Sequence, residues 1–137
     1  AMKLPVLVST TALSFCMALA LTPLSFAQTT VEIARGNCKS TSDRCQKTLT
    51  YCNAKKGALG ENNVTDSLKD CIAICNAAEN ILARNSTLRG KTAALATEAC
   101  TSVAKSCDQF PKDTTMQGCA NEVRKCIGNL QKVNESK

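Results

Sequence analysis

The sequence contains no histidine and no tryptophan, and it has only one tyrosine and three phenylalanines in 137 residues. Without histidine, the chain lacks the side chain that most often acts as a general base and most often binds a metal. The sequence has no glycine-rich phosphate-binding loop, and no serine or cysteine has a neighbour that would activate it as a nucleophile. We therefore predict that the protein is not an enzyme.

The sequence also lacks a block of basic residues. It has 17 Lys and Arg against 11 Asp and Glu, a formal net charge of +6. This excess is spread along the chain rather than gathered on one segment, which argues against nucleic-acid binding. Weak attraction to an anionic surface is all that the charge predicts.

The first 27 residues are typical of a secretory signal peptide. Lys3 provides a basic start, residues 6–24 are mostly apolar, and residues 25–27 (Ser-Phe-Ala) fit a small-x-small cleavage site. The alternative is a membrane anchor, but polar residues and a proline interrupt the apolar run. Ala1 ahead of Met2 is an extra residue. We expect residues 28–137 to form one periplasmic or secreted domain with no membrane span after cleavage.

Cysteine is abundant where aromatic residues are scarce. Nine of the ten cysteines follow residue 27, and only Tyr51 and Phe110 remain as aromatic residues in that part of the chain. Such a cysteine content is typical of a disulfide scaffold or a metal-thiolate protein, and export favours disulfides.

Four segments have the periodicity of helices, and none reads as a strand. The first helix is expected over about 30–56, followed by a loop over 57–63. The second opens at Thr65 or Asp66, and the residues 84–87 (RNST) break the pattern. Ser86 or Thr87 is expected to cap a third helix that reaches residue 109 or 110, and the fourth runs from about 113 to 133. The sequence therefore predicts an all-α fold, a single antiparallel up-down-up-down four-helix bundle.

The spacing of the cysteines places them on stripes. Successive cysteines lie seven positions apart in three of the four predicted helices, so their thiols share one face about 10.5 Å apart and must meet another helix. Cys71 and Cys75 differ, because residues at i and i+4 lie one above the other and can share one metal ion. Thiolates facing inward would select a soft ion, Cu(I) first and zinc next.

The same cysteines also allow a disulfide interpretation. Cys107 and Cys119 lie at equal distances from the turn at Pro111, as do Cys100 and Cys126. The first two helices give the rougher pairs Cys52–Cys71 and Cys45–Cys75, which leave Cys38 without a partner. Four such disulfides, each contributing about 2–4 kcal/mol, would strengthen a core that is poor in aromatic residues.

One segment carries a resemblance to a known family. The stretch CIAICNAAENILARNS at 71–86, with the later Cys100, Cys107, Cys119-Ala120 and Cys126, resembles the cysteine-rich four-helix-bundle copper-storage family. The resemblance covers about 67–130. It implies a bundle of similar length, often exported, whose interior holds Cu(I) through thiolates, largely in Cys-x3-Cys pairs on single helices.

This resemblance implies a set of copper ligands, but the chain also lacks some cysteines that the family pattern contains. The expected ligands are Cys45, Cys52, Cys71, Cys75, Cys100, Cys107, Cys119 and Cys126, with Cys38 and Met116 as additional candidates. However, Ala96, Val103, Val123 and Leu130 stand where the family would place second cysteines, so about half of the usual ligands are missing. The expected partners are copper ions or a protein that donates or accepts copper.

Two functions remain open from the sequence. The first is Cu(I) storage or buffering by an exported bundle. The second is a disulfide-stapled structural or interaction module that binds no metal.

Overall fold

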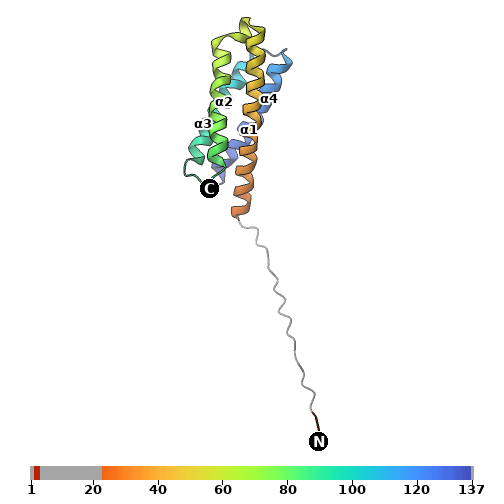
Figure 1. Cartoon of the computed structure of the whole chain (residues 1–137), viewed down its shortest axis with the longest axis vertical. Helices are drawn as coiled ribbons and strands as arrows, with labels where there is room; N and C mark the ends of the chain where they lie inside the picture. Colours follow the sequence, from red (N-terminus) through yellow and green to blue (C-terminus); the bar gives the residue numbers. More distant parts are fainter. Residues whose placement is uncertain (1, 4–22, 137) are drawn as a thin grey trace.

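The computed structural model describes residues 2–3 and 23–136, which include four α-helices and one short 3₁₀ helix (Figure 1). The elements are α1 (Pro23–Lys55), η1 (Gly57–Gly60), α2 (Asn62–Leu82), α3 (Arg89–Asp108) and α4 (Thr114–Glu135). The described residues contain no strand, which confirms the all-α prediction. The predicted signal peptide lies largely outside the described residues, although 23–27 begin α1.

The helices pack as a bundle in which each one contacts two neighbours: α1 with α2 and α4, and α3 with α2 and α4. Contacts between neighbours run in opposite sequence order. For example, Asn37 near the middle of α1 meets Asn129 late in α4, and Tyr51 near the end of α1 meets Asp113 at the start of α4. Ser67 early in α2 meets Ser106 late in α3. This order is that of antiparallel neighbours, as the short links between helices require.

The first link is shorter than predicted, because α2 begins at Asn62 and not at Thr65 or Asp66. Glu61 is extended, with φ −65° and ψ 148°, and its carbonyl accepts hydrogen bonds from the backbone N–H groups of Val64 and Thr65. Residues 57–60, predicted as loop, form the 3₁₀ turn η1. Gly57 opens this turn at φ +60°, a conformation that glycine adopts without strain.

The second link is longer than predicted, because α3 begins at Arg89 and neither Ser86 nor Thr87 caps it. The Ser86 hydroxyl instead accepts a hydrogen bond from the Leu88 N–H, and the Ser86 carbonyl accepts one from the Arg89 N–H. These bonds close a turn before the helix. The fourth helix begins as expected, with the Asp113 carboxylate accepting a hydrogen bond of 2.9 Å from the Met116 N–H.

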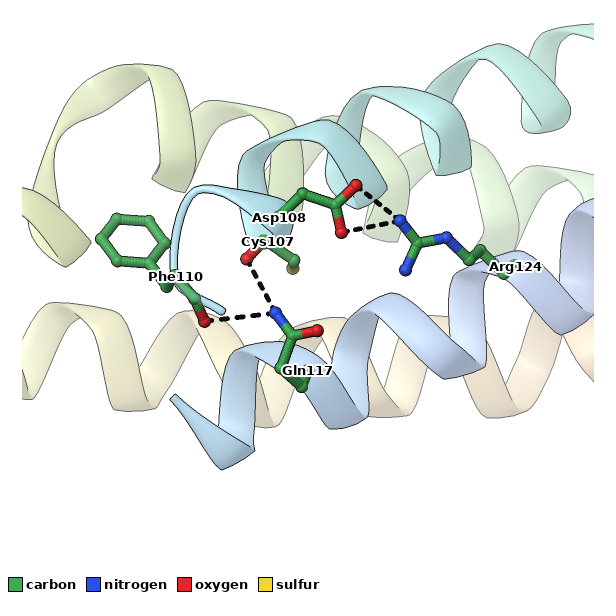
Figure 2. A network of polar contacts seen from close by, with 5 residues as sticks. All are labelled: Cys107, Asp108, Phe110, Gln117 and Arg124. Carbon is green, nitrogen blue, oxygen red and sulfur yellow. Dashed lines mark hydrogen bonds and ion pairs between the residues drawn. The ribbon is translucent and has the colours of Figure 1, made fainter. Parts of the chain in front are cut away.

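The turn between α3 and α4 is held by side chains from α4 (Figure 2). The Gln117 amide donates hydrogen bonds of 3.2 Å to the carbonyls of Cys107 and Phe110, which also accept backbone hydrogen bonds within the turn. One guanidinium nitrogen of Arg124 donates to both carboxylate oxygens of Asp108 and forms an ion pair with them. These contacts fix the position of Cys107 along the bundle axis relative to α4.

The core has two chemically different parts. Small and branched aliphatic residues fill the end that holds the α2–α3 link, and we call it the Leu82 end; its buried residues include Val31, Ala34, Ala78, Leu82, Ala93, Ala96, Leu130 and Val133. Sulfur dominates the remainder, toward the end that holds η1 and the α3–α4 turn. We call that the Cys52 end.

Candidate metal centre

All nine cysteines from Cys38 onward are free thiols with no exposed surface. Every helix contributes: three from α1, and two each from α2, α3 and α4. Their sulfurs, together with the buried thioether of Met116, follow one another along the interior of the bundle, and we call this set the sulfur row. The heptad spacing explains the arrangement, since residues seven apart share one face of a helix.

The middle of the row contains three thiols that converge. Cys71 and Cys75, on successive turns of α2, place their sulfurs 3.8 Å apart. The sulfur of Cys100, on α3, lies 3.8 Å from that of Cys71 and 4.0 Å from that of Cys75. All three sulfurs lie within 4.8 Å of one another, and we call them the Cys100 cluster. The expectation that Cys71 and Cys75 lie close enough to share an ion therefore agrees with their geometry.

A second group of three shares Cys75 with the first. The sulfurs of Cys38, Cys75 and Cys126 also lie within 4.8 Å of one another, and we call them the Cys126 cluster. It joins α1, α2 and α4. Cys38, which had no partner in the predicted pairing, is thus a full member of a candidate site. Two adjoining ions would have Cys75 as a common ligand.

The remaining sulfurs extend the row toward the Cys52 end. Cys45 and Cys119 place their sulfurs 4.0 Å apart, and the Cys107 thiol is also hydrogen-bonded to Cys119. The Cys52 thiol donates to the Met116 thioether at 3.6 Å. Met116 is in the first turn of α4 and Cys52 in the last turn of α1, so this pair lies nearest the Cys52 end.

None of the four alternative disulfides is formed between the described cysteines, which are all free. Two of those pairs do bring their thiols together, Cys107 with Cys119 and Cys100 with Cys126. In the first hairpin the register differs, because Cys45 meets Cys71 and Cys38 meets Cys75. Because α2 begins earlier than predicted, at Asn62, the turn between α1 and α2 is centred nearer the N-terminus of the chain. Each cysteine of α2 therefore lies opposite an earlier residue of α1 than predicted.

Hydrogen bonds between the thiols raise the pKa of some cysteines and lower the pKa of others. The pKa of Cys100 lies above its ordinary value, chiefly because it shares its hydrogen with Cys126 and then with Cys71 and Cys75, and burial adds to this. The pKa of Cys71 lies below its ordinary value, chiefly because Cys100 bonds to it. A cation that bound to a buried row of this kind would replace thiol protons, since a metal deprotonates its thiol ligands.

Comparison with known proteins agrees with this geometry. The family model described as copper storage protein matches residues 27–135. No curated protein matches the chain. No solved structure matches it either. None of the described helices is long and apolar enough to cross a membrane.

Proposed function

Because this chain belongs to the copper storage protein family, we propose that it stores or buffers copper as Cu(I) on the thiolates of the sulfur row. The observation that carries the proposal is the convergence of three thiols at two adjoining points, the Cys100 and Cys126 clusters. Thiolates are soft ligands, which favour Cu(I) over harder divalent ions. The role is binding and release rather than catalysis.

The position of the sulfurs supports a direction for loading. The Leu82 end is closed by aliphatic side chains that offer no ligand, whereas Cys52 and Met116 lie within one turn of the opposite end. An ion that arrives at the Cys52 end would meet this thiol–thioether pair first and then pass to Cys119 and Cys45.

We also propose that the protein acts outside the cytoplasm, after removal of residues 1–27. From residue 28 on, where the structure describes the side chains of α1, the first buried ones are Thr30 and Val31, and the family match begins at residue 27. Cleavage before Gln28 would therefore leave the described core intact.

The test is an anaerobic Cu(I) titration of residues 28–137, with a chromophoric Cu(I) chelator as competitor and alkylation followed by intact mass as a thiol count. We expect nine reactive thiols without reductant, protection of most of them by Cu(I), and recovery after excess chelator. One reactive thiol and a mass lighter by eight hydrogens would identify four disulfides, and the storage proposal would then be wrong.

A further inference from the structure

A buried hydroxyl beside the Cys126 cluster has no nitrogen or oxygen as a hydrogen-bond partner among the described residues. It belongs to Thr41 of α1, whose side chain is fully buried and whose Oγ1 is unpaired. Thr41 lies one turn after Cys38 on the same face of α1, and its hydroxyl faces the Cys126 thiol. An unpaired buried hydroxyl costs stability, so its retention needs a reason.

The helix itself offers this hydroxyl an easy partner that it does not use. A threonine in a helix commonly donates to the carbonyl four residues earlier. Five others in the bundle do so, at 2.8–3.3 Å: Thr48, Thr50, Thr65, Thr97 and Thr101. The corresponding carbonyl for Thr41, that of Asn37, accepts instead from the Ser40 hydroxyl at 3.1 Å. The Thr41 hydroxyl thus lacks the backbone partner that these five use, and it lies against the Cys126 sulfur.

A neutral thiol is a weak acceptor, and a metal-bound thiolate is a strong one. The partner that suits the Thr41 hydroxyl is therefore the Cys126 sulfur in its anionic, metal-bound form. We propose that Thr41 is a positioning residue that donates a hydrogen bond to the Cys126 thiolate when a soft ion occupies the Cys126 cluster. This inference rests on the proposed function and adds an outer-shell ligand partner to it, of the kind that orients a ligand and tunes its affinity.

Thr48 provides the matched comparison within the same helix. It is seven residues further along α1, equally buried, and its hydroxyl faces Cys119. However, its hydrogen is already donated to the Arg44 carbonyl at 2.9 Å. Replacing Thr48 with valine therefore removes the same atoms without removing a free donor.

The experiment compares Thr41→Val, Thr41→Ser and Thr48→Val by Cu(I) competition against a chelator and by thermal unfolding of the metal-free proteins. Loss of an outer-shell partner commonly weakens metal binding by roughly 10- to 100-fold. We expect that loss for the tightest-held ions in Thr41→Val, near-normal affinity in Thr41→Ser, and a smaller effect in Thr48→Val. The metal-free Thr41→Val protein should unfold at the same or a higher temperature, because an unpaired hydroxyl has been removed.

Two outcomes would overturn the inference while the proposed function stands. One is wild-type Cu(I) affinity in Thr41→Val. The other is a loss of affinity that matches a loss of metal-free stability, which would indicate packing alone. If the wild-type protein binds no Cu(I), the proposed function fails, and a Cd²⁺ titration of the same variants, followed by the ultraviolet absorbance of the thiolate–metal bond, decides instead. Thr41→Val should then bind Cd²⁺ more weakly than wild type, and equal affinities would reject the role of Thr41.

Discussion

At the scale of single residues, the cysteines are not equivalent. Cys75 belongs to both three-thiol clusters, whereas Cys107 belongs to neither and contacts Cys119. Both are fully buried cysteines, so the same substitution changes the same atoms at each position. The pair therefore separates the effect of losing a shared ligand from the general effect of altering a buried thiol.

We predict that Cys75→Ser weakens Cu(I) binding more than Cys107→Ser does. Serine keeps the size of the side chain but replaces a soft sulfur with a hard oxygen, so Cys75→Ser disrupts two candidate sites at once. The expected loss for the tightest ions is about 10-fold or more relative to Cys107→Ser, measured by chelator competition. Equal losses in the two variants would show that copper is distributed without preference for the two clusters.

The sequence predicted that these cysteines face the interior, but not which of them meet. Spacing within one helix is fixed by helical geometry, and this predicted the contact of Cys71 with Cys75. Contacts between helices depend also on the length of the link, and a start of α2 at Asn62 rather than Thr65 altered the neighbours of Cys38 and Cys45. The second hairpin had a proline and an aspartate cap to mark its turn, and its pairs Cys107–Cys119 and Cys100–Cys126 were placed correctly as neighbours.

At the scale of the helices, polar residues set the register that aligns the sulfurs. Asn37 with Asn129 and Ser40 with Glu122 join α1 to α4, and Ser67 with Ser106 joins α2 to α3. The start of α4 is fixed by Asp113, which caps the helix and also accepts a hydrogen bond of 2.7 Å from the Tyr51 hydroxyl of α1. This single carboxylate thus helps to place Met116 opposite Cys52, near the end of α1.

We predict that Asp113→Ala lowers the free energy of unfolding by about 1 kcal/mol, the usual cost of losing a helix cap, and that Asp113→Asn restores most of it. Chemical denaturation of the metal-free proteins measures this. The hydrogen bond from the Met116 N–H holds the pKa of Asp113 below its ordinary value in the folded protein. The ionised Asp113 carboxylate therefore contributes its full stabilisation of the folded protein above about pH 4, the ordinary pKa of Asp. This stabilisation is lost as the pH falls further. A deficit in Asp113→Ala that stays constant below that pH would contradict this account.

At the scale of the whole molecule, the bundle combines a sulfur interior with one aliphatic end. The core contains no fully buried aromatic residue among the described ones, and its largest fully buried side chains include Leu68, Leu82, Met116 and Leu130. Small side chains let four helices approach closely enough for thiols from three of them to meet within 4.8 Å. The scarcity of aromatic residues, visible in the sequence, is thus a condition for the clusters rather than only a weakness of the core.

The N-terminal boundary of the buried core lies within α1. Helix α1 begins at Pro23, but Thr30 and Val31 are its first residues known to be buried. A protein that starts at Gln28 should therefore keep the thermal midpoint and the Cu(I) capacity of the bundle. One that starts at Arg35 loses Val31 and Ala34 from the Leu82 end and should be destabilised by about 2–4 kcal/mol, because aliphatic side chains are removed from a packed core. Intact mass of protein recovered after export should give Gln28 as the first residue. Recovery of uncleaved protein, or equal stability of the two shortened forms, would mean that the functional unit begins elsewhere.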